Sequence, residues 1–222
     1  MNAGFFKRAF SSLIDITIVL AVVAATFYIA GRSILRNQIS NFDIIFTAYN
    51  EVIDAYNSDY DAATEEFNVQ MDIADGDTDL EALASQVYQA RVQIINDQNL
   101  IDIEPYNRSL TRYFMNNIYY FSIGFLILIA IYTVAFNGKT LGRRVMNIAL
   151  DGPVNPVSVF FHDVILKYFF VILVFMVSVY IGLLLLALSI IIDIVLISFT
   201  KNKTTLRDVL LRMTVSNKNY WK

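Results

Sequence analysis

Long apolar blocks alternate with polar stretches along this 222-residue chain, and three blocks stand out: residues 6–30, 113–136 and 158–200. About 20 apolar residues suffice for a helix to span a bilayer, so each of the first two blocks predicts one transmembrane helix. The third block is too long for one helix and accommodates two, which we expect at 159–179 and 183–200 with a tight turn near 180–182. The pattern predicts an all-α, polytopic membrane protein with four transmembrane helices.

Charge is distributed unevenly, and this predicts the orientation of the helices. Residues 33–112 contain 15 acidic and 4 basic residues, whereas the rest of the chain contains 5 acidic and 13 basic ones. Short loops rich in Lys and Arg remain in the cytoplasm. Basic residues of this kind occur at the start of the first block, between the second and third blocks, and in the tail: Lys7, Arg8, Lys139, Arg143, Arg144, Lys201, Lys203, Arg207 and Arg212. We therefore expect a multi-pass protein of the bacterial plasma membrane with both termini in the cytoplasm.

This orientation divides the chain into parts. We expect a cytoplasmic N-terminus and first helix at 1–32, an acidic extracytoplasmic insert at 33–112, helices two to four at 113–200, and a basic tail at 201–222. A basic cytoplasmic loop, residues 137–157, joins helices two and three. The first block is longer than the apolar core of a signal peptide, and no clean cleavage site follows it, so we interpret it as a retained helix.

The insert is too long for a simple connection and has helical periodicity. Apolar and aromatic residues recur at spacings of three and four on two arms: Tyr49, Ile53, Tyr56, Tyr60, Ala63 and Phe67, then Leu80, Leu83, Val87, Ala90 and Ile94. Between the arms, DIADGDTD predicts the turn of a helical hairpin. Its carboxylates also suggest a calcium loop, but the spacing does not fit an EF-hand, and Thr78 with Glu81 fits a helix capping box.

Catalytic motifs are missing from the chain. It has no Cys and one His, and neither G-x-S-x-G nor H-E-x-x-H occurs. The GKT at 138–140 lacks the preceding Gly of a phosphate-binding loop, and His162 has no second nitrogen ligand for a metal site. We expect no enzymatic activity, no cofactor, no metal ion and no nucleic-acid partner.

Ionisable residues within the apolar blocks are the candidate functional groups. Arg8 and Asp15 are seven residues apart and fall on nearly the same helical face, about 10 Å apart along the axis. Asp193 lies at a similar expected depth in the last helix. Two carboxylates in a low-dielectric crevice could exchange a proton for a cation. Alternatively, Asp15 forms a buried structural bridge with Arg8 or Lys167, and the sequence leaves both readings open.

Two internal similarities suggest that the helices form two related hairpins. TLGRRVMNIAL follows the second block and TLRDVLLRMTV follows the fourth helix, and a pair of Phe residues opens each hairpin, at Phe5–Phe6 and Phe160–Phe161. The pattern indicates a diverged parallel repeat, or a chance similarity between apolar, basic segments.

These segments resemble the RDD family of bacterial integral membrane proteins, named for an Arg and two Asp residues. KRAFSSLID resembles the family's opening motif, NGKTLGRRVMNIAL its Thr-Leu-Gly loop and TTLRDVLLRMTV its closing segment. The resemblance assigns the Arg to Arg8, one Asp to Asp15 and the other to Asp208 or Asp193. Its cytoplasmic motif comprises Thr140, Leu141, Gly142, Arg143, Arg144, Thr205, Leu206 and Asp208. Arg207 replaces the usual His, and the insert is longer than a typical family loop.

The resemblance implies transport of a ligand, and cation/proton exchange is reported for some relatives. We accordingly expect transport or cation/proton coupling through intramembrane carboxylates. The alternative is a non-catalytic scaffold or accessory subunit that docks a membrane or extracytoplasmic protein through the acidic insert. Four helices enclose little volume, so a transporter of this size is expected to form homo-oligomers in the lipid bilayer. We also expect the two cytoplasmic motif segments to lie side by side, with Arg143 or Arg144 facing Asp208.

Overall fold

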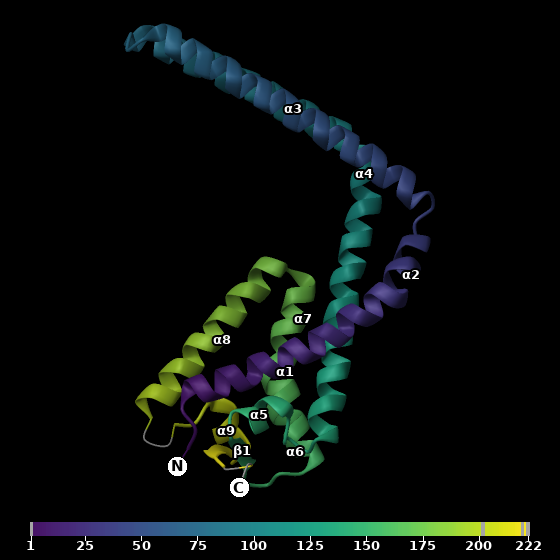
Figure 1. Cartoon of the computed structure of the whole chain (residues 1–222), viewed down its shortest axis with the longest axis vertical. Helices are drawn as coiled ribbons and strands as arrows, with labels where there is room; N and C mark the ends of the chain where they lie inside the picture. Colours follow the sequence, from purple (N-terminus) through teal and green to yellow (C-terminus); the bar gives the residue numbers. More distant parts are fainter. Residues whose placement is uncertain (1, 201–202, 219, 221–222) are drawn as a thin grey trace. The chain divides into compact units, whose positions relative to one another are not determined.

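A computed structural model describes residues 2–200, 203–218 and 220, and it is nearly all-α (Figure 1). Lys201, one of the basic tail residues, lies outside these ranges. Four helical segments within them are long and apolar enough to cross a membrane: Phe5–Asn37, Thr78–Ala135, Pro156–Val177 and Val179–Phe199. The chain therefore has the character of a multi-pass integral membrane protein, as its hydrophobic pattern predicts.

The structure divides into two compact units. The first contains Met1–Arg32 and Asn117–Lys222, and the second is Ser33–Asn116. The helix α4 (Thr78–Ala135) contributes to both units. We expected its apolar part to be a separate helix at 113–136, but the helix continues without interruption from Thr78. The strongest helix breaker between the two predicted helical stretches is Pro105, and α4 passes through it.

The first unit begins with α1 (Phe5–Thr26), which a π-helical turn, η1 (Phe27–Gly31), extends toward α2 (Arg32–Asn37). Its apolar core forms where α1 packs against the end of α4 and the third span. Val23 and Ile129 are almost completely buried there, beside Val19, Phe125 and Val164. Gly124 allows this approach, because a Cβ atom at that position would lie 3.3 Å from Val23.

The third and fourth spans form a hairpin (Figure 1). The third consists of α6 (Pro156–Phe160), the π-helical η2 (Phe161–Phe169) and α7 (Phe170–Val177), and the fourth is α8 (Val179–Phe199). The connection is at Ser178, whose backbone is extended, and not at 180–182 as expected. Ser178 ends α7 and caps α8, because its hydroxyl accepts a hydrogen bond from the Ile181 amide at 3.5 Å.

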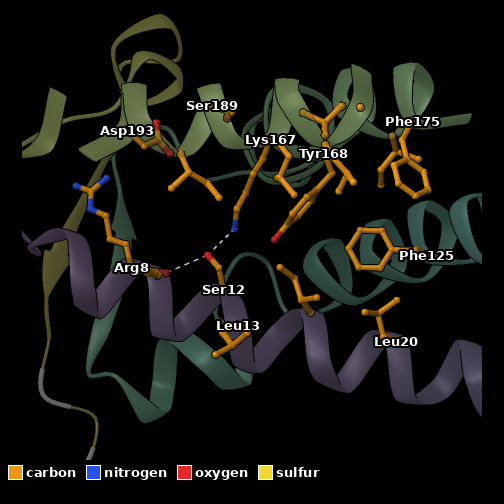
Figure 2. Close-up of a pocket in the computed structure, with 18 of the residues that line it drawn as sticks. Arg8, Ser12, Leu13, Leu20, Phe125, Lys167, Tyr168, Phe175, Ser189 and Asp193 are labelled. Atoms are coloured by element: carbon orange, nitrogen blue, oxygen red, sulfur yellow. Dashed lines mark hydrogen bonds between the residues drawn. The ribbon is translucent and has the colours of Figure 1, made fainter. Parts of the chain in front are cut away.

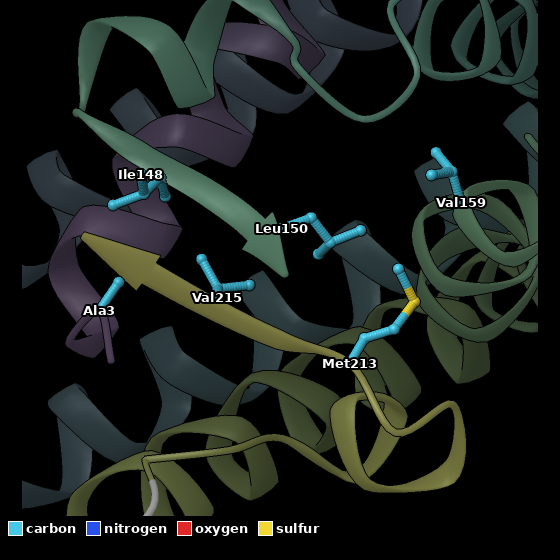
Figure 3. Close-up of a cluster of buried hydrophobic side chains, with 6 residues drawn as sticks. All are labelled: Ala3, Ile148, Leu150, Val159, Met213 and Val215. Atoms are coloured by element: carbon cyan, nitrogen blue, oxygen red, sulfur yellow. The ribbon is translucent and has the colours of Figure 1, made fainter. Parts of the chain in front are cut away.

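A small antiparallel sheet departs from the expected all-α fold. The strand β1 (Ile148–Asp151) pairs with β2 (Thr214–Asn217), so the middle loop and the tail are joined. The sheet covers a hydrophobic cluster shown in Figure 3: Ala3, Ile148, Leu150, Val159, Met213 and Val215. Each strand has four residues and little alternation of apolar and polar positions, which explains why the sequence pattern did not reveal it.

The two sequence segments that resemble each other have the same local structure. Thr140 caps α5 (Leu141–Val145) and Thr205 caps α9 (Leu206–Leu210), and each side chain accepts a backbone hydrogen bond three residues on. A residue with positive φ follows each helix, Asn147 or Arg212, and a strand follows that residue. The two segments therefore share one local structure, which a chance similarity of sequence would not require.

The pairing of the strands relates the segments by an approximate two-fold axis. Leu150 follows Thr140 by ten residues, and Val215 follows Thr205 by ten, so the two occupy equivalent positions. They are also direct partners in the sheet. An antiparallel pair in which equivalent residues face each other has a two-fold axis at that pair, so each strand is the counterpart of the other.

The second unit contains α3 (Phe42–Ala74) packed along the first part of α4. Tyr88 connects the helices by stacking on Phe67 and by contacting the Thr64 hydroxyl at 3.3 Å. The turn lies in the predicted DIADGDTD stretch, but its cap differs from our expectation. The Asp77 carboxylate accepts hydrogen bonds from the amides of Asp79 and Leu80, so Asp77 and not Thr78 caps α4.

Gly182 tests the packing of the α7–α8 hairpin. A Cβ atom at this position would lie 2.4 Å from the Phe175 Cα atom, and a backbone atom cannot move aside easily. Gly182→Ala should therefore lower the free energy of unfolding by about 2 kcal/mol, measured by thermal melts in detergent. Gly4→Ala is the control, because a Cβ there meets nothing within 4 Å. Equal melting temperatures for the two variants would contradict the packing.

Candidate functional site

Asp15 joins α1 to the segment that contains α5. Its Oδ1 atom accepts hydrogen bonds from the Tyr132 hydroxyl at 2.8 Å and from the Gly142 amide at 2.9 Å. Its Oδ2 atom accepts one from the Thr140 hydroxyl at 2.7 Å. Tyr132 is itself fixed, because its hydroxyl oxygen accepts the Leu141 amide hydrogen bond at 2.8 Å. The carboxylate is only 7% exposed, so these three donors replace the water that it loses on burial.

This contact requires a glycine in the Thr-Leu-Gly sequence. A Cβ atom at Gly142 would lie 2.1 Å from the Ser11 carbonyl oxygen and 2.9 Å from the Asp15 carboxyl group. Only a residue without a side chain allows the α5 backbone to approach α1 so closely. Thr140 and Gly142 thus act together, the first through its hydroxyl and the second through its amide.

A buried relay of five ionisable groups connects four distant parts of the chain. Arg8 at the start of α1 pairs with Asp208 of α9 at 2.5 Å. Asp208 also contacts His162 Nε2 at 2.8 Å, and His162 Nδ1 contacts Asp163 at 2.8 Å. Asp163 pairs with Arg143 of α5 at 2.6 Å. All five residues are less than 9% exposed, so they form one desolvated polar core.

His162 bridges the two carboxylates of the relay. Its Nδ1 atom lies 2.8 Å from an Asp163 carboxylate oxygen, and its Nε2 atom lies 2.8 Å from an Asp208 carboxylate oxygen. Arg8 and Arg143 lie at the two ends, so each carboxylate of the core has a cationic partner. Charges removed from water are tolerated in such a paired and hydrogen-bonded arrangement.

Two groups of the relay, Asp208 and Arg143, are held in their charged forms. Burial opposes ionisation of Asp208, but the hydrogen bond from His162 and the charge of Arg8 hold the pKa of its carboxyl group below the usual range. Burial would lower the pKa of the Arg143 guanidinium, but the charge of Asp163 raises it. Arg143 also donates to the Gly138 carbonyl at 2.7 Å.

Two expected pairings are wrong. Asp15 does not pair with Arg8 or Lys167: Arg8 pairs with Asp208, and Lys167 donates to the Ser12 hydroxyl at 2.6 Å. Neither Arg143 nor Arg144 pairs with Asp208. The His162–Asp163 dipeptide lies between Arg143 and Asp208, so the motif segments meet through η2. Arg144 instead donates to the Lys139 carbonyl at 3.0 Å and lies over the Phe136 ring.

Asp193 belongs to a different part of the unit from Asp15. It pairs with Arg207 at 3.0 Å and lines a cavity of about 560 Å³. Asp15 lines a much smaller cavity of about 30 Å³, beside the relay. Ser12 and Lys167 line both cavities. The two carboxylates therefore do not face each other across one crevice.

The charged side chains that line the larger cavity lie together, away from Phe125 and Phe175 (Figure 2). Lys167 points into it toward Ser12, while Phe125, Phe175 and Leu20 line the other end. Its walls come from α1, α4, η2, α7 and α8, and Arg207 of α9 contributes at the polar end. The cavity thus offers an apolar chamber with ionisable groups at one end.

The remaining motif residues have structural positions. Thr205 is completely buried and forms a capping box with Asp208, whose carboxylate accepts the Thr205 amide hydrogen bond at 2.9 Å. Leu141 and Leu206, which occupy equivalent positions in the two segments, are both exposed.

Sequence reasoning missed the role of several residues. His162 and Asp163 interrupt the apolar run, and this signal marked them as polar, but not as the centre of a relay. Tyr132 and Ser12 had no signal beyond their polarity. The paired Phe residues offered a signal for the role of Asp163. Asp163 follows Phe161 by two residues, just as Arg8 follows Phe6 by two, so the two charged residues occupy equivalent positions.

Comparison of the chain with protein-family models, with curated proteins and with solved structures found no match.

The pH dependence of stability tests the relay. Because the pKa of Asp208 is lower in the folded protein than in the unfolded chain, its ionisation stabilises the fold above the unfolded value of about 3.9, and this stabilisation is lost as the pH falls toward the folded value. Asp208→Asn should therefore cost about 3 kcal/mol at pH 7, because Arg8 and His162 lose their anion. The difference from wild type should narrow below about pH 4.

Circular-dichroism melts of both proteins between pH 3 and pH 7 measure this difference. Asp43→Asn is the control, because the Asp43 side chain is 85% exposed and makes only a loose contact with Arg36. A difference that stays constant down to pH 3 would argue against an ionised Asp208 in the relay.

Proposed function

We propose that this protein is a multi-pass protein of the bacterial plasma membrane, of the RDD type, that moves a solute in a process coupled to protons or cations. The observation that carries the proposal is the cavity of about 560 Å³ between the membrane-spanning helices, with Lys167, Asp193 and Arg207 at one end. Ionisable groups within transmembrane segments that face a cavity are functional-site candidates, because burying them without a function is costly.

The proposal assigns different roles to the carboxylates. Asp15 accepts three hydrogen bonds and lies in the polar core, so it serves the structure. Asp193 has one ion-pair partner and is partly exposed to the cavity, so it can respond to a ligand or a proton. The coupling group is then Asp193, together with Arg207 and Lys167.

The assignment to the RDD type gains support from the contacts of the signature residues. Arg8 of the opening motif pairs with Asp208 of the closing motif, and Asp15 binds the backbone and side chain of the Thr-Leu-Gly segment. Residues that share a family motif for a structural reason are expected to touch one another in this way. This favours Asp208 over Asp193 as the second signature Asp.

A scaffold function is the second candidate, and the surface of the second unit favours it. Several large apolar side chains on α3 and α4 there are more than half exposed: Ile44, Val69, Ile73, Leu83, Ile94, Leu100 and Ile101. Such residues on an acidic helical pair are typical of a surface that binds another protein. In this reading the protein is non-catalytic, and the extracytoplasmic insert docks a partner or a second copy.

Cysteine labelling tests the orientation on which both functions depend. The natural chain has no Cys, so each variant carries one reactive thiol. A membrane-impermeant maleimide applied to intact cells should label Asp72→Cys and leave Lys139→Cys unlabelled until the cells are opened. Both positions are exposed, so burial does not account for a difference. Labelling of Lys139→Cys on intact cells would refute the orientation.

Flux through reconstituted vesicles tests the coupling role. Asp193→Asn should abolish cation- or solute-driven proton movement while the protein stays folded, and Asp193→Glu should retain it, because the carboxylate is kept. Asp15→Asn should instead lower the melting temperature, since it disturbs three hydrogen bonds. A pH-sensitive dye inside the vesicles reports the flux. Wild-type vesicles without any driven proton flux would remove the transport proposal and leave the scaffold.

A further inference from the structure

We propose that the larger cavity binds a long-chain carboxylate, with the hydrocarbon chain between the helices and the carboxylate at Lys167. This inference rests on the proposed function and names the chemical class of its ligand. Its basis is the shape of the cavity, the distribution of polar groups in it and the position of Lys167, which has no ion-pair partner among the described residues.

The dimensions of the cavity suit a single extended chain. Its volume of about 560 Å³ lies within the range of roughly 300–1,000 Å³ found for small-molecule pockets. Along α8 the lining runs from Gly182 through Asp193 to Ile197, about 22 Å at the helical rise, and the part between Gly182 and Asp193 is about 16 Å. Along α1 it runs from Phe5 through Ser12 to Leu20, also about 22 Å. The space is thus elongated and parallel to the helices.

The chemistry of the walls changes along this length. Beyond the charged groups, aliphatic and aromatic side chains from α1, α4, α7 and α8 line the space, among them Leu20, Phe121, Phe125, Phe175, Leu183 and Leu186. Figure 2 shows the same separation, with Lys167 and Asp193 away from Phe125 and Phe175. A ligand that fills this cavity must be apolar over most of its length and polar at one end.

The polar end favours an anion. Three cationic side chains line it, and two of them have a carboxylate partner: Arg8 pairs with Asp208, and Arg207 pairs with Asp193. Lys167 has no ion-pair partner among the residues that the structure describes; its amine donates to the neutral Ser12 hydroxyl and lies 4.7 Å from the centre of the Tyr168 ring. A cation in a low-dielectric site without a counter-charge attracts an anion strongly.

Arg207 supplies a second hydrogen-bond donor at the end of the cavity where Lys167 lies. The Arg207 Nε atom is buried and makes no hydrogen bond to any described residue. Lys167 and Arg207 thus supply N–H groups at the same end of the cavity. A carboxylate accepts hydrogen bonds at two oxygens, and such charge-assisted bonds are the strong ones. A neutral alcohol of the same chain length would lack this interaction.

Equilibrium binding to the full-length protein in phosphatidylcholine nanodiscs tests the proposal. The probes are radiolabelled palmitate and hexadecanol, which have the same chain length but differ in head-group charge. We expect one saturable palmitate per chain, bound at least about tenfold more tightly than hexadecanol, since a charged hydrogen bond contributes this much. Equal affinities for the two probes would overturn the proposal, because the cavity would then select no anion.

Matched variants connect the binding to this cavity. Lys167→Met should reduce palmitate affinity to that of hexadecanol without changing hexadecanol binding, and Lys167→Arg should largely restore it. Leu186→Trp should fill the cavity and abolish both. Leu188→Trp is the control, because Leu188 is on the same helix and similarly exposed but does not line the cavity. Unchanged palmitate binding by folded Lys167→Met protein would overturn the role of the lysine.

Two further measurements distinguish a long-chain carboxylate from a membrane lipid, and ligand binding from transport. Competition by phosphatidylglycerol at concentrations matched to palmitate would identify a two-chain anionic lipid as the occupant and overturn the proposal. Proton flux in vesicles reports on the proposed function separately. Proton flux without palmitate binding would refute the long-chain carboxylate as ligand and leave the transport proposal standing. Palmitate binding by a protein that shows no flux would support the ligand site and refute transport.

Discussion

Charges buried among apolar helices must find their counter-charges within the protein, because lipid supplies none. In this chain that constraint is met at the relay from Arg8 to Arg143, through Asp208, His162 and Asp163. These five residues come from four segments: α1, α5, η2, which contains both His162 and Asp163, and α9. Their pairing therefore does more than neutralise charge. It holds the tail and the middle loop against the first and third spans, and the two short strands pair beside it.

The approximate two-fold relation between the segments explains how one histidine can serve both ion pairs. Arg143 and Asp208 are equivalent, since each follows its capping threonine by three residues, and Arg8 and Asp163 are equivalent relative to their paired Phe residues. The ion pairs are thus related by the axis, but with reversed charge. The reversal places carboxylates at both positions next to His162. Had the second pair repeated the charges of the first, the imidazole would have faced a carboxylate on one side and an arginine on the other.

Much of the helical architecture could be predicted, and the pairing of side chains could not. The apolar length of each span is a local property, and so is the capping role of Thr140 or Thr205. The strands escaped prediction because each has four residues and is stable only beside the other. The relay could not be predicted for a related reason, because Arg8 and Asp208 are separated by most of the chain. Judged by charge alone, Arg143 was an equally good partner for Asp208. Only the position of His162 between them excludes that pairing.

The contacts of the buried groups also distinguish Asp15, the carboxylate in the sequence motif, from Lys167, the group that is able to bind a ligand in the cavity. The sequence pattern draws attention to Asp15, because an acidic residue inside an apolar helix is conspicuous. In the folded protein both of its oxygens accept hydrogen bonds from the segment around α5 and from Tyr132, so the carboxylate holds α1 to that segment. Lys167 makes a single hydrogen bond, to a neutral hydroxyl, and it lies where the polar core meets the apolar cavity. No described carboxylate lies within ion-pair distance of its amine, so the amine can bind an anionic group that enters the cavity, as the proposed ligand requires.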